Sequence, residues 1–207
     1  MNSVPALTSG EAFEAVLRAL ASGSVVGVPT DTVYGLAVRC GDEEALRRLF
    51  VLKGRPASVA IAVLVADLAQ AGELAGDSVA LARLAERFWP GPLTVVVRKR
   101  AGLGLWLGGF DDTVGLRCPA EDYVRALCRA AGPLAVSSAN RHGEAPLTSA
   151  GDLAALFGDD LLVVDGGRRD GVPSTVVSLE ESPARQLREG PVAFADIAAA
   201  LGASPPP

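Results

Sequence analysis

The sequence has few of the residues that build metal centres and disulfide frameworks. It contains one histidine, His142, and three widely separated cysteines, Cys40, Cys118 and Cys128. No Cys-x-x-Cys pair occurs, so neither a disulfide framework nor a zinc site of Cys and His ligands is expected. Unpaired cysteines fit a reducing cytoplasm. We expect His142 to lie at the surface in a polar loop.

Long apolar runs and targeting signals are also missing. No apolar run approaches the roughly 18–20 residues that cross a bilayer, so no membrane span is expected. The first residues, MNSVPALTSGEAFEAV, have no basic segment followed by an apolar one, so no signal peptide is expected.

An excess of positive charge is missing as well. The chain has 24 Asp and Glu against 19 Lys and Arg, a net charge of −5 and a pI of about 5.0. This balance argues against a general nucleic-acid binder, which normally presents a basic face. A small anionic ligand held by a few local cations stays compatible with it.

The common nucleotide and hydrolase signatures are absent. The sequence has no G-x-x-x-x-G-K-[ST] P-loop and no G-x-G-x-x-G after a strand. No spacing supports a Ser-His-Asp triad. A nucleotide site, if there is one, must therefore be built differently.

The length and patterning indicate one folded domain. With 207 residues and 49% hydrophobic composition, we expect a single domain over 8–201 and a disordered tail over 202–207. Helices are expected at 11–22, 43–52, 77–89, 121–131, 150–157 and 193–201. Strands are expected at 24–29, 60–65, 93–97, 113–117, 133–137, 161–164, 172–179 and 185–188. Because helices and buried strands alternate, the fold class is α/β (α+β), with one twisted sheet flanked by helices.

Small polar residues stand at the ends of several apolar strands. The segments are PTDT at 29–32, SSAN at 137–140 and PSTVV at 173–177. Such residues often serve as caps and turns. Ligands of α/β sheets also bind at strand ends, where short side chains and backbone amides meet. Three such segments in one chain favour a binding site.

Four cations stand close to these segments or to strand ends. Lys53 and Arg55 close a helix, where they would also face its dipole. Arg117 ends a strand and Arg188 lies in LREG. Each arginine offers a planar fork that suits a carboxylate or a phosphate. Both the capping and the anion-binding interpretation remain open on residue chemistry alone.

Seven segments in order carry a family resemblance: PTDTVYGL, LKGRP, FWPGPLTVVV, TVGLRCP, SSAN, PSTVV and LREG. Together they resemble the YrdC/TsaC family of threonylcarbamoyl-AMP synthases, in its short single-domain form. The match runs from about Ala12 to Ala199. The resemblance implies a twisted mixed sheet flanked by helices, with a concave, basic-lined cavity.

The resemblance also implies an activity. Members are nucleotidyltransferases that make L-threonylcarbamoyladenylate and pyrophosphate from L-threonine, bicarbonate and ATP, and Mg²⁺ would ride on the phosphates without a dedicated set of protein ligands. A partner transferase complex then modifies tRNA, and direct RNA binding is expected to be weak or absent. Such a reaction needs positioning and charge neutralisation more than a protein nucleophile.

Residue roles follow from the same resemblance. Thr32, Arg117 and Ser174 resemble threonine contacts. Thr113 and Arg188 resemble nucleotide contacts. The catalytic group is expected to comprise the cations Lys53 and Arg55 together with Ser138 and Asn140, with Arg55 and Ser138 also touching ATP.

One position departs from the family pattern. The family usually has Lys or Asn followed by Pro where this chain has Val59 and Ala60. The loss of one charge-assisted hydrogen bond costs about 1.5–3 kcal/mol, or tenfold or more in ATP affinity. Either another cation (Lys99, Arg100 or Arg141) replaces it, or the chain is a diverged paralogue that binds nucleotide or carbamoyl-adenylate without making it. A third hypothesis is an RNA-binding translation factor.

Overall fold

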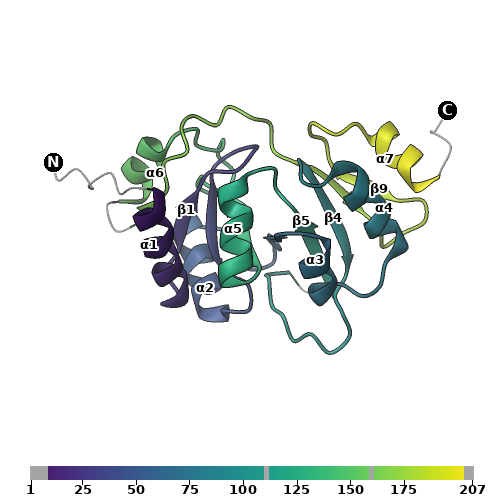
Figure 1. Cartoon of the computed structure of the whole chain (residues 1–207), viewed down its shortest axis with the longest axis horizontal. Helices are drawn as coiled ribbons and strands as arrows, with labels where there is room; N and C mark the ends of the chain where they lie inside the picture. The colour runs from purple at the N-terminus through teal and green to yellow at the C-terminus, as the bar shows by residue number, and fades with distance from the viewer. Residues whose placement is uncertain (1–8, 110–111, 159–160, 203–207) are drawn as a thin grey trace.

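The computed structural model describes residues 9–109, 112–158 and 161–202, and Figure 1 shows its arrangement. Within these ranges one mixed sheet of nine strands runs through the molecule in the order β7-β1-β2-β6-β3-β5-β4-β8-β9. The strands are β1 (Val26–Val28), β2 (Gly35–Arg39), β3 (Ala62–Leu64), β4 (Leu93–Arg98), β5 (Thr113–Arg117), β6 (Leu134–Ser138), β7 (Leu162–Val163), β8 (Thr175–Ser178) and β9 (Arg185–Arg188). The helices are α1 (Ser9–Ala21), α2 (Glu43–Lys53), α3 (Leu68–Leu74), α4 (Val79–Phe88), α5 (Asp122–Ala131), α6 (Ala150–Phe157) and α7 (Phe194–Leu201). The expected α/β class with a twisted mixed sheet is confirmed.

The sheet mixes parallel and antiparallel pairs. β1 and β2 are antiparallel, as are β2 and β6, β6 and β3, β5 and β4, and β8 and β9. β3 and β5 are parallel, and so are β4 and β8 and the edge pair β1 and β7. The parallel neighbours β3 and β5 are joined by a crossover that contains α3 and α4, because parallel strands cannot be connected by a tight turn.

One face of the sheet is covered by a large apolar core. Alternate strand residues such as Leu36, Val63, Val95 and Leu116 are fully buried there. Helices α2, α3, α4 and α7 supply the opposing side chains, among them Leu49 of α2. Burial of these apolar groups provides the main stabilisation of the domain.

The other face is covered over only part of its extent. Helices α1 and α5 pack on each other and on the sheet, with Leu20 and Leu127 fully buried between them and the strands. Both helices lie over the β1 half of the molecule in Figure 1. Beyond them, each of five adjacent strands contributes a residue that is only partly buried: Val136 (β6), Ala62 (β3), Gly115 (β5), Val96 (β4) and Val176 (β8). This uncovered part of the face forms the floor of a cavity.

Two elements are absent from the sequence prediction. β2 follows the PTDT loop directly, and its residues Gly35–Val38 are fully enclosed between β1 and β6. A four-residue apolar run that opens with glycine has little strand propensity of its own. α3 is a seven-residue helix that begins at the Asp67 cap; it is too short for apolar periodicity to reveal.

Most predicted elements occur within one to three residues of their expected bounds. Helix starts agree with the cap residues, because the side chains of Asp42 and Ser78 accept from the backbone N–H groups of Ala45 and Leu81. His142 is exposed as expected. Of the predicted tail at 202–207, Gly202 caps the end of α7 and residues 203–207 lie outside the described residues. No helix among the described residues is long and apolar enough to cross a membrane.

Candidate active site

A cavity of about 410 Å³ lies on the uncovered part of the sheet face. Its floor consists of alternate residues of β6, β3, β5, β4 and β8, and its rim comes from the loops after β1, α2 and before β8. Three arginines, Arg55, Arg117 and Arg188, reach its wall, whereas no lining residue within the described ranges is acidic. The cavity therefore presents positive charge and hydroxyl groups to a ligand.

Small residues on the floor of this cavity leave space for a ligand. A Cβ atom added to Gly115 would lie 3.4 Å from Thr94 Cγ2 and 3.8 Å from the Cβ of Ala62. All three residues line the cavity. A side chain at position 115 would therefore project into the space that a ligand would fill.

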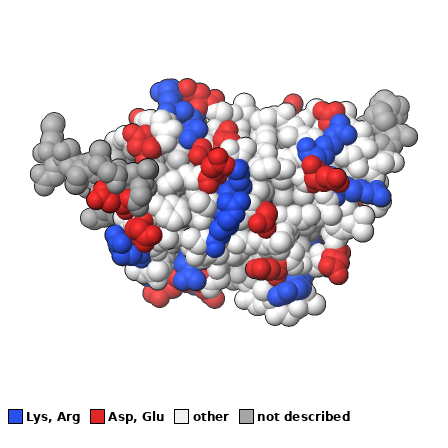
Figure 2. Space-filling view, in the orientation of Figure 1, with Lys and Arg blue, Asp and Glu red and all other residues white. Residues whose placement is uncertain are grey.

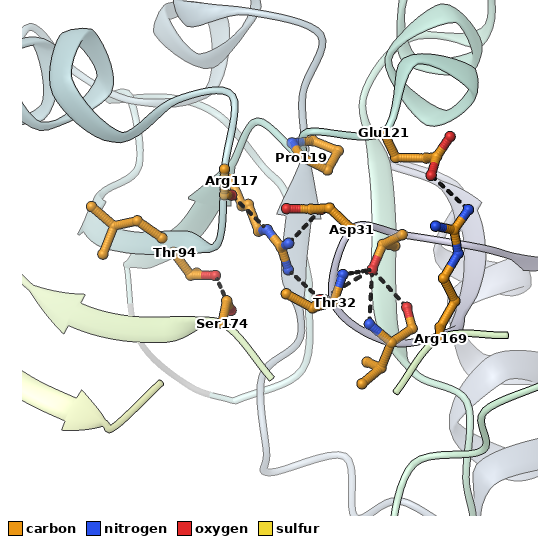
Figure 3. A network of polar contacts seen from close by, with 12 residues as sticks. Asp31, Thr32, Thr94, Arg117, Pro119, Glu121, Arg169 and Ser174 are labelled. Atoms are coloured by element: carbon orange, nitrogen blue, oxygen red, sulfur yellow. Dashed lines mark hydrogen bonds and ion pairs between the residues drawn. The ribbon is translucent and has the colours of Figure 1, made fainter. Parts of the chain in front are cut away.

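Arg117 lies at the centre of a buried polar network, which Figure 3 shows from close by. Its Nη2 donates to Asp31 Oδ1 at 2.6 Å, its Nη1 to Thr32 Oγ1 at 3.0 Å, and its Nε to the Gly91 carbonyl at 3.0 Å. The residue is only 6% exposed. These bonds use three of the five guanidinium N–H donors, so two are left to serve a bound anion.

The PTDT loop holds this network from the other side. Thr30 Oγ1 accepts from the backbone N–H groups of Thr32 and Val33, and its hydroxyl lies 3.0 Å from that of Thr32. Thr30 and Thr32 are each 4% exposed. The polar loop after β1 is thus a rigid support for Arg117 as well as part of the cavity wall.

A second polar group stands across the floor from the first. Ser174 Oγ lies 2.8 Å from Thr94 Oγ1 and accepts from Arg188 Nη2 at 3.0 Å. Arg188 Nε also donates to the Ser174 carbonyl at 2.9 Å. Figure 3 shows Thr94 and Ser174 beside Arg117. Arg188, from the edge strand β9, is thereby oriented toward the cavity.

Arg55 approaches from the loop after α2. Gly54 adopts the left-handed conformation that ends the helix, with φ 63°. Arg55 then donates Nε to the Val59 carbonyl at 2.9 Å and Nη2 to the Ala60 carbonyl at 2.7 Å. The side chain is therefore held by the backbone of its own loop.

The three cavity arginines influence one another's protonation. Burial is the main cause that lowers the pKa of Arg55, Arg117 and Arg188. The charge of Arg188 adds to the effect on Arg55, and the charge of Arg117 adds to the effect on Arg188. Arg188 thus lies electrostatically between the other two. Mutual repulsion of this kind is relieved when an anion binds.

Lys53 faces protein oxygens and is not among the cavity lining. It is 1% exposed, and its Nζ donates to the Ser138 carbonyl at 2.5 Å and to the carbonyl and Oδ1 of Asn140 at 2.9 and 3.0 Å. Burial, with a further contribution from Arg55, lowers the pKa of Lys53 to about 8. Lys53 and Asn140 thus lie behind Ser138, which does line the cavity.

The structure brings together most of the residues expected at the site. Seven line one cavity: Thr32, Arg55, Thr113, Arg117, Ser138, Ser174 and Arg188. Thr30, Tyr34 and Thr94 also line it and were not predicted individually. A threonine inside the apolar run LTVVV was the only sequence signal for Thr94. Tyr34 lay within the PTDTVYGL motif, and its hydroxyl bonds the backbone of Gly166 and Gly167.

The register of β5 gives the cavity two ends. Thr113 and Arg117 are four residues apart on one strand and face the same side, which separates them by about 13 Å. Arg117 lies at the end that contains Thr32, Thr94 and Ser174. The sequence predicted a site at the strand ends. The cavity also extends from these ends across the face of the sheet.

Comparisons with known proteins identify the family. The family model for Sua5, YciO and YrdC, described as "Telomere recombination", matches residues 18–190. The chain belongs to the Sua5/YciO/YrdC family. It is 39% identical over 184 residues to the threonylcarbamoyl-AMP synthase of Pyrococcus abyssi, covering 87% of this chain and 54% of that protein. It is also 39% identical to the threonylcarbamoyl-AMP synthase of Chromohalobacter salexigens, covering 79% of this chain and 90% of the relative.

A solved structure agrees with the fold. The crystal structure of P. abyssi Sua5 complexed with L-threonine superimposes with a TM-score of 0.87 and 36% identity, covering 95% of this chain and 58% of that one. The chain thus spans little more than half the length of its P. abyssi relative. It covers nearly all of the shorter relative from C. salexigens.

Proposed function

We propose that this protein is an L-threonylcarbamoyladenylate synthase, which makes threonylcarbamoyl-AMP and pyrophosphate from L-threonine, bicarbonate and ATP. The observation that carries the proposal is the two-ended cavity with three arginines, in a chain 36% identical to a protein solved with L-threonine. Its products would serve a tRNA-modifying transferase complex, and its place would be the cytoplasm.

The end around Arg117 suits an amino acid. Two guanidinium N–H donors are available for a carboxylate there, and the hydroxyls of Thr32 and Ser174 lie beside them. Asp31 and the Gly91 carbonyl fix the plane of the guanidinium. We assign Arg117 to the threonine carboxylate and the two hydroxyls to its polar groups.

The other end suits a nucleotide. Arg55 at this end and Arg188, which reaches the cavity from beside Ser174, would neutralise the phosphates, and Thr113 and Ser138 would offer hydroxyl groups to the nucleotide. Lys53 would act through Ser138 and Asn140, whose segment it holds from behind. No group of three or more His, Cys, Asp or Glu side chains that could hold a metal occurs among the described residues. We infer from the family resemblance that Mg²⁺ would arrive on the phosphates of ATP.

This arrangement supports the chemistry by positioning. The threonine nitrogen forms a bond to the carbon of bicarbonate while a C–O bond breaks and water leaves, which gives the carbamate. A carbamate oxygen then displaces pyrophosphate from the α-phosphorus of ATP. No step needs a protein nucleophile, but each develops negative charge. Fixed arginines stabilise such charge without reorganisation during the reaction.

The decisive test is mass spectrometry of a reaction with ATP, L-threonine and bicarbonate. Threonylcarbamoyl-AMP is expected from the wild-type protein, with a loss of at least a hundredfold in Arg117→Ala. Arg48→Ala, whose side chain pairs with Glu44 on the surface of α2, is the matched control. Absence of product from the wild-type protein would refute the proposal.

A second candidate rests on Val59 and Ala60, where the family carries Lys or Asn and Pro. Their carbonyls hold Arg55, and the Val59 side chain is 39% exposed. A diverged paralogue would bind ATP without forming product. Titration of ATP into the protein in parallel with the product assay separates this outcome from a failure to bind nucleotide.

The hypothesis of an RNA-binding factor has weaker support. On the face shown in Figure 2, Lys and Arg alternate with Asp and Glu, without a continuous basic patch. With a net charge of −5, direct tRNA binding is expected to be weak and to fall steeply with salt.

A further inference from the structure

The glycine-rich loop at 101–109 contacts the loop that carries Arg55. The backbone N–H of Gly109 donates to the Ala57 carbonyl at 2.8 Å, and the N–H of Ile61 donates to the Leu107 carbonyl at 3.0 Å. The two loops therefore lie side by side and share hydrogen bonds at both ends of the 57–61 segment. We call residues 106–109 the clasp.

The clasp is itself anchored to α2 and the core. The ring of Trp106 packs against Phe50 with centroids 5.5 Å apart, and the guanidinium of Arg47 lies 4.7 Å from the Trp106 ring centre. Leu107 is 1% exposed within the apolar core. This anchoring leaves the clasp little freedom to move away from the Arg55 loop.

Gly108 is the point of closest approach. A Cβ atom there would lie 2.6 Å from Phe50 Cζ, 3.1 Å from the Ala57 carbonyl oxygen and 3.2 Å from the Val59 carbonyl oxygen. The Val59 carbonyl is the acceptor for Arg55 Nε. A side chain at position 108 would therefore collide with Phe50 and press against the Val59 carbonyl that orients Arg55.

We propose that Gly108 is a positioning residue for Arg55: its missing side chain lets the clasp hold the Val59 and Ala60 carbonyls where they aim the guanidinium into the cavity. This inference rests on the proposed role of Arg55 at the nucleotide end. It also gives Val59 and Ala60 a function that depends on their backbone and not on their side chains.

The same loop contains a matched control. Gly102 has φ +77° and Gly108 has φ +78°, so alanine meets the same backbone strain at both positions. A Cβ atom at Gly102, however, would have nothing within 4 Å. A difference between Gly108→Ala and Gly102→Ala therefore reports the contacts of position 108, with Phe50 as well as with the Arg55 loop, and not the strain. The Arg55→Ala background then separates an effect that passes through Arg55 from one that does not.

The test is calorimetric titration of Mg-ATP, and separately of L-threonine, into the wild-type protein and both variants. Gly108→Ala should weaken ATP binding about tenfold, the loss expected for one misplaced charge-assisted hydrogen bond. Threonine binding should stay within twofold, and Gly102→Ala should match the wild type for both ligands. In an Arg55→Ala background, Gly108→Ala should have no further effect on ATP binding.

A second readout does not depend on nucleotide. The rate at which phenylglyoxal modifies Arg55, followed by peptide mass spectrometry, should change in Gly108→Ala and not in Gly102→Ala. If the wild type fails to bind ATP while this change occurs, the nucleotide role falls and the positioning role stands. An unchanged rate, a full effect in the Arg55→Ala background, or an equal loss in Gly102→Ala would overturn the inference.

Discussion

Arg117 and Asp31 form an ion pair inside the protein, with Nη2 and Oδ1 2.6 Å apart and side chains only 7% and 13% exposed. The carboxylate compensates a guanidinium that burial would otherwise destabilise. A second charged pair, Arg47 and Glu43, lies on the surface of α2 with both side chains more than half exposed. The two pairs should therefore respond differently to removal of the acid.

Asp31→Asn should lower the free energy of unfolding by about 3 kcal/mol, because it leaves a buried charge without its partner. Glu43→Gln should cost less than about 1 kcal/mol. Urea unfolding at low and high salt measures both, and only the surface pair should weaken with salt. Equal costs for the two variants would contradict the buried character of the Arg117 pair.

Gly115→Val should reduce ligand affinity without unfolding the protein. Its Cβ has room at 3.4 Å from Thr94, while the added methyl groups would occupy the cavity floor. Valine also suits a β-strand better than glycine. We expect at least a tenfold loss of threonine or ATP binding by calorimetry, with a melting temperature no lower than that of the wild type. The affinity of Gly115→Ala should lie between those of the wild type and Gly115→Val. Unchanged binding in Gly115→Val would mean that the ligand does not bind over this part of the sheet.

Thr94→Val tests the hydroxyl that faces Ser174. Threonine and valine side chains have nearly the same shape, so the substitution removes the 2.8 Å hydrogen bond to Ser174 and little packing. The free energy of unfolding should fall by only about 1 kcal/mol, because Ser174 keeps its hydrogen bond from Arg188. Threonine affinity should fall several-fold while ATP affinity stays the same. If only the affinity for ATP fell, the Arg117 end would bind the nucleotide and the other end the threonine, contrary to our assignment.

The sequence predicted the alternation of helices and strands and seven of the residues in the cavity wall, because caps, apolar runs and motif residues act locally. It did not predict β2, whose apolar run is short and opens with Gly35 and whose stability comes from its two partner strands. It did not separate Lys53 from Arg55 either. Both cations close one helix, yet one lies behind Ser138 and the other lines the cavity. Such differences depend on tertiary contacts that residue type and spacing do not encode.

The free energy of unfolding at alkaline pH should depend on the titration of the buried Lys53. Burial lowers the pKa of Lys53 to about 8 from the ordinary lysine value of 10.5. Between these values the unfolded chain binds more protons at this site than the folded chain, so the free energy of unfolding rises with pH across this window. The stabilisation that comes from deprotonating Lys53 is complete only above the unfolded pKa of 10.5, and it is lost as the pH falls from 10.5 toward 8.

Lys53→Met removes this titration, so the measurement is the difference in unfolding free energy between the wild type and this variant from pH 7.5 to about pH 10.5. The wild type should gain up to roughly 3 kcal/mol on the variant across the window. The thiols of Cys40 and Cys128, whose pKa values burial raises to about 12, contribute an opposite slope, but equally to both proteins. A difference that stays flat with pH would mean that Lys53 keeps its charge, and that the oxygens of Ser138 and Asn140 fully offset its burial.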